Sequence, residues 1–179
     1  MVNSPHETVA AVVDPELLVV TIEELGVLRS VTTDDSGRVT VAITPTYSGC
    51  PAMDAIRADI RAALASAGHC DVDVVTQLAP AWSSDLISES GRAKLAAAGV
   101  APPARVTSPA GVPSPATLAE PAPVSARRSA GPVPVALSVR CPRCGSPDTR
   151  RLSAFGSTAC KALWRCEACR EPFDEFKPL

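Results

Sequence analysis

The sequence predicts a small α/β (α+β) sandwich, with one sheet covered by helices, joined by a Pro-rich linker to a C-terminal metal-binding ribbon. Three observations lead to this prediction. Residues 1–100 show helical and extended patterns in the order α-β-β-α-β-α, and residues 101–138 contain nine of the 18 prolines. Residues 139–179 contain two Cys-x-x-Cys pairs. The first unit is long enough to form a layered core, whereas the last is too short to fold without a metal ion.

Composition restricts the class of protein. The chain has 179 residues, a net charge of −2, and 46% hydrophobic but only 3% aromatic residues. The negative balance argues against nucleic acid as the main partner, because phosphate binding needs clustered Lys and Arg. The N-terminus lacks the features of a secretory signal, and no apolar run approaches the ~20 residues that span a bilayer. We therefore expect a cytoplasmic protein whose seven cysteines are ligands or reactive thiols rather than disulfides.

The first unit begins with the signals of a helix followed by a β-hairpin. Ser4 and Glu7 are spaced as a capping box at the start of the helix. The helix is expected to stop near Asp14, because a residue before proline is disfavoured in the helical region. Strands are predicted over residues 26–33 and 38–44, with an Asp-Asp-Ser-Gly turn between them.

The second half of this unit continues with a longer helix. Residues 51–67 are predicted to form it, and Gly68 is placed to end it. Four apolar residues of this helix fall on one stripe: Met53, Ile56, Ile60 and Leu64. A third strand is predicted over 72–75 and one or two short helices within 82–98. One sheet covered by helices follows from this order.

The Pro-rich segment, residues 101–138, has almost no hydrophobic periodicity. Such a segment buries too little surface to offset its conformational entropy, so a disordered linker is predicted. It would tether the ribbon to the first unit without requiring the two to dock.

The ribbon, residues 139–179, carries the strongest chemical signal. Its two Cys-x-x-Cys pairs are separated by 21 residues and supply four thiolates for one tetrahedral ion. The predicted ligands are Cys141, Cys144, Cys166 and Cys169. Strands are expected over 150–155 and 162–165, with a third around Phe173 and Phe176.

The identity and role of this ion depend on its ligands. Four thiolates suit zinc and also a single iron, and the first knuckle, Cys-Pro-Arg-Cys-Gly, is of a kind shared with rubredoxins. The second knuckle has Arg170 in place of the glycine, which favours Zn²⁺. A closed four-sulfur site leaves no open position for catalysis, so a structural role is favoured. Acidic residues offset the basic residues of the ribbon, so a solvated or protein-docking surface is preferred over nucleic acid.

Four further residues could carry chemistry. Cys50 is predicted at the N-cap of the 51–67 helix, where the helix dipole would favour its thiolate; an ordinary turn cysteine is the alternative. Asp14 and Glu16 flank Pro15, and from the residues alone they are a helix stop with solvated charges. Cys160 is a fifth ribbon thiol, either a structural residue at a strand edge or an auxiliary thiol at a second site.

Several motifs resemble known families. Three segments are similar to the small α/β domain of SufT-like iron–sulfur assembly factors: Asp14-Pro-Glu-Leu-Leu-Val-Val-Thr-Ile-Glu-Glu-Leu-Gly26, Thr44-Pro-Thr-Tyr-Ser-Gly-Cys-Pro51 and Pro80-Ala-Trp-Ser-Ser-Asp85. The tail adds Phe155-Gly-Ser-Thr-Ala-Cys-Lys-Ala and Cys166-Glu-Ala-Cys-Arg-Glu-Pro-Phe-Asp-Glu-Phe-Lys177. With these, nearly everything except the linker resembles the PaaD family, accessory subunits encoded with the bacterial phenylacetyl-CoA ring 1,2-epoxidase.

This resemblance implies a pathway, partners and a site. It implies an accessory, non-catalytic subunit of aerobic phenylacetate catabolism, whose partners are the oxygenase and the iron–sulfur flavin reductase. The subunit would support iron–sulfur or iron-centre maturation, with Cys50 as the reactive or iron-handling residue and Asp14 and Glu16 close to it. A transient iron or iron–sulfur cluster is implied as a second metal. One departure is Leu17-Leu18, where the family often has Ile-Pro.

Two other functions remain as alternatives. One is a structural subunit that bridges epoxidase components and delivers no metal. The other is a thiol-dependent enzyme that uses Cys50, which is disfavoured because no histidine lies near it in the sequence to act as a base. The chain has neither a Glu-x-x-His pair nor a Gly-rich dinucleotide motif, so it is not expected to be the di-iron oxygenase or the reductase itself.

Overall fold

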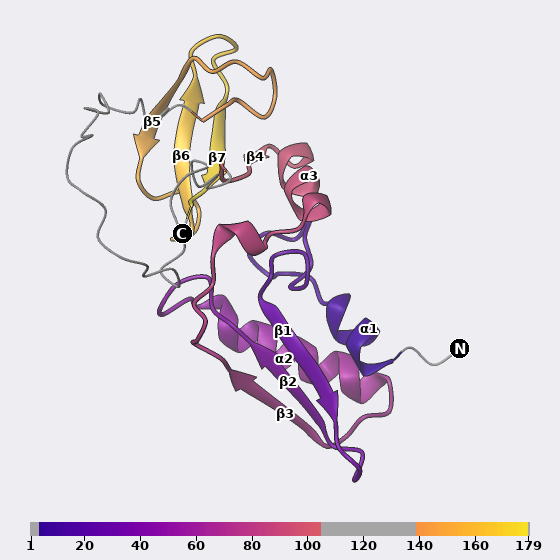
Figure 1. Cartoon of the computed structure of the whole chain (residues 1–179). Helices are drawn as coiled ribbons and strands as arrows, with labels where there is room; N and C mark the ends of the chain where they lie inside the picture. The colour runs from indigo at the N-terminus through magenta and orange to yellow at the C-terminus, as the bar shows by residue number, and fades with distance from the viewer. Residues whose placement is uncertain (1–3, 105–138, 179) are drawn as a thin grey trace, which may run out of the picture.

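The computed structural model describes residues 4–104 and 139–178, which form an α/β unit and a β-ribbon in contact with each other (Figure 1). The predicted disorder of the linker falls on residues 105–138, which lie outside the described residues. Among the described helices, none has the length and apolar character needed to cross a membrane.

The first helix, α1 (Pro5–Ala10), has the predicted capping box. The Glu7 amide donates to Ser4 Oγ (3.2 Å) and the Ser4 amide donates to Glu7 Oε2 (2.8 Å). The helix is shorter than predicted and ends four residues before Asp14. The chain then forms an isolated bridge between Val13 and Thr21, so the Asp-Pro-Glu segment lies in a turn between two bridged residues.

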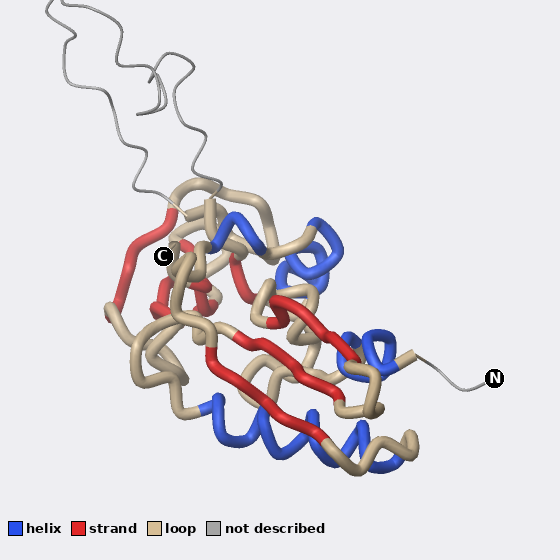
Figure 2. The backbone as a smooth tube through the Cα atoms, turned by 60° about the horizontal axis from the view of Figure 1, so that its bottom comes forward, coloured by secondary structure: helices blue, strands red, loops and turns tan. Residues whose placement is uncertain are grey.

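The first unit is built on a three-stranded sheet in the order β1-β2-β3. Strands β1 (Leu28–Thr33) and β2 (Val39–Ile43) form the predicted antiparallel hairpin, and β3 (Val72–Thr76) pairs parallel to β2. The parallel pairing requires a crossover, which α2 (Ala52–Ser66) supplies. Helix α2 runs along one face of the sheet (Figure 2), and α1 contacts both α2 and β1.

The core of this unit lies between the sheet and α2. All four residues of the predicted helical stripe are buried, and they pack against Val39, Val41 and Ile43 of the central strand. These strand residues alternate with others on the opposite face, as expected for a sheet with one covered side. The predicted mixed α/β fold class is therefore confirmed.

The end of the first unit leads toward the ribbon through three short elements. They are a 3₁₀ turn, η1 (Ser84–Leu86), helix α3 (Glu89–Ala97) and the two-residue strand β4 (Val100–Ala101). The buried guanidinium of Arg92 donates to the carbonyl oxygens of Ser84 (2.6 Å), Ile87 (3.3 Å) and Pro103 (2.6 Å). This side chain therefore fixes the course of the chain on both sides of α3.

The ribbon joins the first unit through a shared sheet. Strands β5 (Thr149–Ser153), β6 (Lys161–Cys166) and β7 (Pro172–Phe176) are antiparallel neighbours, and β4 pairs parallel to β7 at the edge. Figure 1 shows β4 next to β7 and α3 beside the ribbon. Ala101, predicted as the first linker residue, is buried in this pairing. The structure therefore shows the ribbon docked on the first unit, although a tether of this kind does not require it.

Side chains at the end of the ribbon complete the core of the first unit. Phe176 is buried and its ring centroid lies 5.8 Å from that of Trp82, with the planes tilted by 54°. Trp82 is held in turn by the hydrogen bond from its Nε1 to the Leu25 carbonyl oxygen (2.9 Å). Cys160 belongs to the same buried cluster. The apolar contact between the two units explains the docking, since β4 alone contributes only two residues.

Candidate metal sites

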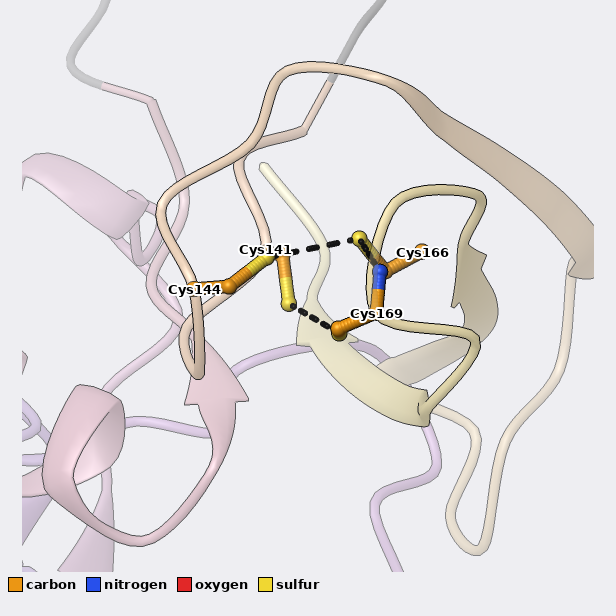
Figure 3. A group of neighbouring side chains, drawn as sticks. All are labelled: Cys141, Cys144, Cys166 and Cys169. Atoms are coloured by element: carbon orange, nitrogen blue, oxygen red, sulfur yellow. Dashed lines mark hydrogen bonds between the residues drawn. The ribbon is translucent and has the colours of Figure 1, made fainter.

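The four predicted ribbon ligands lie together. Cys141 and Cys144 come from the segment before β5, Cys166 ends β6, and Cys169 lies in the turn between β6 and β7. All four side chains are directed toward one another (Figure 3). Their sulfur atoms lie within 4.8 Å of one another. The Sγ–Sγ distance is 3.8 Å for Cys141 and Cys169 and 3.5 Å for Cys144 and Cys166. A tetrahedral zinc with Zn–S bonds of ~2.3 Å has sulfur–sulfur edges of ~3.8 Å, so this donor set fits a structural zinc ion.

The backbone of the two knuckles is alike despite their different sequences. Gly145 and Arg170 each follow the second cysteine of a pair, and both adopt the left-handed conformation (φ 74° and 66°). Arg170 also donates to Glu167 Oε2 (2.8 Å). The amide of Cys169 donates to Cys166 Sγ (3.5 Å) and lowers the pKa of that thiol to about 7. The departure at Arg170 thus leaves the shape of the knuckle unchanged.

A second cluster of polar groups lines a small pocket between the two units. The pocket contains the three residues that the resemblance implied, Cys50, Asp14 and Glu16, and also Cys160 from the ribbon. The rest of its wall is mostly apolar and includes side chains of α2 and Phe176. The cavity volume available to the centre of a water molecule is about 10 Å³, so the pocket can hold about one water molecule. The pocket therefore joins a turn, a loop and a ribbon segment that are far apart in sequence.

Asp14 shapes the turn at one side of the pocket. It is only 7% exposed, and its Oδ1 accepts hydrogen bonds from the amides of Glu16 and Leu17, both at 2.9 Å. Burial raises the pKa of Asp14, although these two hydrogen bonds oppose the shift. The solvated helix stop that the residues alone suggested is therefore wrong for Asp14, because the bridge on either side of the turn carries it into the interior.

The Leu17-Leu18 sequence gives this turn its own geometry. Leu18 has φ 59°, and its amide donates to the Asp14 carbonyl oxygen (2.9 Å). Proline fixes φ near −65° and has no amide proton. The turn seen here is therefore incompatible with the proline that the resembling family often has at this position.

Cys50 lies one residue before Pro51, the N-cap of α2, and is partly buried. Burial raises the pKa of Cys50, the Ala52 amide opposes this shift, and the charges of Glu16 and Asp14 raise it further. The prediction of a favoured thiolate is therefore wrong for the free site. Withdrawal from water and two neighbouring carboxylates outweigh the amide at the start of the helix.

Cys160 approaches the same carboxylate from the ribbon. Its thiol lies 3.9 Å from Glu16 Oε2 and 3.0 Å from Thr158 Oγ1. Burial raises the pKa of Cys160, and the charge of Glu16 adds to this effect. The pKa of Glu16 is itself raised, first by burial and then by Asp14. The structure places this thiol directly before β6, buried in the wall of the pocket, which is compatible with both roles that the sequence left open.

Sequence reasoning missed two residues near these groups. Burial and the charges of Cys50 and Glu16 raise the pKa of Tyr47. Lys161 is 6% exposed and lies 3.8 Å from Asp174 at the ribbon side, where its charge also acts on Asp14 and Glu16. Tyr47 precedes Cys50 in its loop, so its proximity could have been inferred. Nothing in the sequence brings Lys161 to the Asp-Pro-Glu turn.

The two clusters differ in what they can do. Among the described residues, the ribbon cysteines are the one group of three or more candidate ligands close enough together to hold a metal ion. The pocket instead holds thiols and carboxylates that have not converged, a mixed donor set suited to a divalent ion of intermediate softness. Neither His6 nor His69, both in the described part of the chain, lines the pocket. A histidine-activated cysteine nucleophile is thus not formed here.

Comparison with known proteins matches the two parts of the chain to two different family models. Residues 7–76 match the family model of an iron-sulfur cluster assembly protein, and residues 126–177 match the PaaD zinc beta ribbon domain. The chain is also 42% identical over 164 residues to an Escherichia coli (strain K12) protein that is named as one of the subunits of 1,2-phenylacetyl-CoA epoxidase. This match covers 92% of the present chain and 85% of the Escherichia coli protein.

Two further relatives match a shorter part of the chain. One is an Fe-S protein maturation auxiliary factor of Porphyromonas gingivalis (35% identity, 47% of this chain and 80% of that protein). The other is the Fe-S protein maturation auxiliary factor SufT of Staphylococcus aureus (34% identity, 47% of this chain and 96% of that protein). A whole relative of this kind therefore corresponds to less than half of the present chain.

Proposed function

Because the chain belongs to the PaaD family of phenylacetyl-CoA epoxidase subunits, we propose that it is the accessory subunit that supports iron–sulfur or iron-centre maturation of this epoxidase. In this proposal it acts in aerobic phenylacetate catabolism and does not turn over the substrate itself. Its partners would be the oxygenase and the iron–sulfur flavin reductase. The supporting observation is the pocket that holds Cys50, Asp14 and Glu16 in a domain of the iron–sulfur assembly type.

The chemistry of the pocket suits a cargo ion better than a permanent one. A soft thiol beside hard carboxylates accepts ferrous iron, and burial raises the pKa values of Cys50, Asp14 and Glu16. Binding of an ion would displace the thiol proton, and the charge of the ion would offset the carboxylates. An ion held by groups that must first lose protons is released readily when a client offers better ligands.

The ribbon has a different part in the proposal. Its zinc, held by Cys141, Cys144, Cys166 and Cys169, would fix the two knuckles, because a closed four-sulfur shell leaves no position for a substrate. The ordered ribbon then presents β7 to β4 and Phe176 to Trp82. Zinc would therefore act on the pocket indirectly, by keeping in place the segment that closes it.

The decisive experiment replaces the pocket thiol in cells. A strain that carries Cys50→Ala should lose growth on phenylacetate, and its purified reductase or oxygenase should contain less iron than that of the parent strain. The matched control is Cys70→Ala, since Cys70 is an exposed cysteine outside the pocket. Full growth and normal iron content in the Cys50→Ala strain would show that Cys50 is structural.

A bridging role without metal delivery is the second candidate. It is favoured by exposed apolar side chains on the ribbon, namely Phe155 (67% exposed) and Leu152 (44% exposed). A bridging role predicts that Phe155→Ser releases partner subunits during co-purification, whereas Cys50→Ala leaves the assembly and its iron content intact. The delivery role predicts the reverse for iron content.

A further inference from the structure

The ribbon contributes a thiol to a pocket that otherwise belongs to the first unit. Cys160 is 5% exposed, and its sulfur lies 3.9 Å from Oε2 of Glu16, 144 positions away in the sequence. The charge of the same carboxylate acts on Cys50. Two thiols from different units therefore share one carboxylate neighbour and one pocket.

The position of Cys160 is fixed by the backbone around it. The Lys177 amide donates to the Cys160 carbonyl oxygen (2.9 Å), and the Lys161 amide donates to the Thr158 carbonyl oxygen (3.1 Å). The first bond ties Cys160 to the end of β7, which pairs with β4. The thiol is thus carried into the pocket whenever the ribbon is docked, and it leaves when the ribbon separates.

We propose that Cys160 is the second thiol ligand of the ferrous ion handled at Cys50, so that docking of the ribbon completes the site. This inference rests on the proposed function and adds a ligand to it. Asp14 and Glu16 supply oxygen donors, giving two sulfurs and two carboxylates, a donor set that serves Fe²⁺ better than a purely oxygen-lined one.

The binding step is an exchange of protons for a metal ion. As each Fe–S bond forms, the corresponding S–H bond breaks and its proton passes to solvent, so two thiols release two protons and no electron is transferred. In the described part of the chain, the sulfur and carboxylate donors of the pocket lie farther apart than the four sulfur atoms of the ribbon cysteines. Side-chain rotation of Cys50 and Glu16 toward Cys160 must therefore accompany binding, which keeps the ion exchangeable.

Cobalt titration of the zinc-loaded, reduced full chain under anaerobic conditions tests this inference. With the ribbon filled by zinc, added Co²⁺ reports on the pocket, because thiolate-to-cobalt absorption grows with the number of thiolate ligands. The wild type should show a two-thiolate band, and Cys160→Ser and Cys50→Ser should each show about half of it. Fe²⁺ is then added as a competitor. The Fe²⁺ concentration that displaces half of the bound Co²⁺ should be at least tenfold higher for Cys160→Ser than for the wild type. Cys70→Ser should behave as the wild type.

The outcomes separate this inference from the proposed function. An unchanged band in Cys160→Ser, together with a weakened band in Cys50→Ser, overturns the role of Cys160 and leaves the Cys50 site standing. Unchanged bands in both variants overturn both. A second measurement needs no variant: Co²⁺ should slow alkylation of Cys50 and Cys160 together in the wild type, as read by mass spectrometry. Protection of Cys50 alone would contradict a shared site.

Discussion

Docking of the ribbon should be weakened most by removal of the Phe176 ring. This side chain is 1% exposed, contacts Trp82 at 5.8 Å and lines the pocket. Truncation of a buried Phe to Ala costs about 3–5 kcal/mol, and this includes about 0.5–1.5 kcal/mol for the aromatic pair. Phe176 belongs to the ribbon but is buried in the core of the first unit, so the loss should fall on the contact between the two units.

The exposure of Cys160 offers a direct assay. In a Cys50→Ser/Cys70→Ser background with zinc bound, Cys160 is the remaining thiol that is not a ribbon ligand, and its alkylation rate reports how often the ribbon undocks. Each 1.4 kcal/mol of lost docking energy gives about a tenfold faster rate. The lower figure of about 3 kcal/mol therefore predicts an increase of at least about a hundredfold for Phe176→Ala.

Phe155→Ala is the matched control, because it removes the same ring from an exposed position on the same ribbon. Its alkylation rate should stay within about twofold of the background, as expected for an exposed substitution worth less than about 0.5 kcal/mol. If Phe176→Ala reacts no faster than Phe155→Ala while zinc content is normal, Phe176 does not hold the ribbon in place, and the interface described above is not the one present in solution.

Three further outcomes are expected. Cys166→Ser should abolish the binding of about one zinc per chain, measured by chelator colorimetry, whereas Cys70→Ser should retain it. Arg92→Ala should lower the free energy of unfolding by about 2 kcal/mol or more in urea titrations, because it removes the guanidinium donor from three buried carbonyl oxygens, of which only that of Ser84 keeps a backbone donor, the Ile87 amide. Lys94→Ala, which removes a half-exposed ion pair with Glu24, should cost less than about 1 kcal/mol. Asp14→Asn should stabilise the chain at pH 7, because burial raises the pKa of Asp14 and the stability that its protonated form contributes is lost as the pH rises through that pKa. The amide keeps the acceptor for both turn hydrogen bonds, so the gain over wild type should shrink as the pH is lowered toward the carboxyl pKa. A constant gain across that range would contradict the assigned cause.

The parts of the fold that follow from local pattern were predictable. The capping box of α1, the β1–β2 hairpin, the buried stripe of α2 and the three ribbon strands all appear within a few residues of their predicted bounds. Each is encoded by residues near one another in sequence, where periodicity and turn chemistry act directly. The end of α1 was placed too late because tertiary bridging to Thr21 competes with continuation of the helix.

The candidate site was predictable only in part. The spacing of the ribbon cysteines identified that cluster without other information, whereas Asp14 and Glu16 were linked to Cys50 through resemblance alone. Docking of the ribbon could not be predicted, because β4 is two residues long and has no sequence pattern of its own. The sequence around Phe176 also does not tell whether its ring is buried inside the ribbon or at the contact with the first unit. The raised pKa of Cys50 likewise depends on burial and on carboxylates that the fold brings in.

The short β4–β7 pairing has a consequence for how this kind of chain could have arisen and how it can be re-engineered. The Staphylococcus aureus relative is matched over 96% of its own length and corresponds to less than half of this chain, so that protein lacks a covalently attached ribbon of this kind. When two modules are fused and one of them places a functional group in the pocket of the other, the effective concentration of that group at the pocket is set by the fusion and not by diffusion of a separate protein. The two modules can then not be exchanged freely between proteins of the family. A ribbon grafted from another member must supply a matching edge strand, an aromatic residue in the place of Phe176 and a thiol in the place of Cys160. Without all three, both modules of the hybrid fold but do not form the shared pocket.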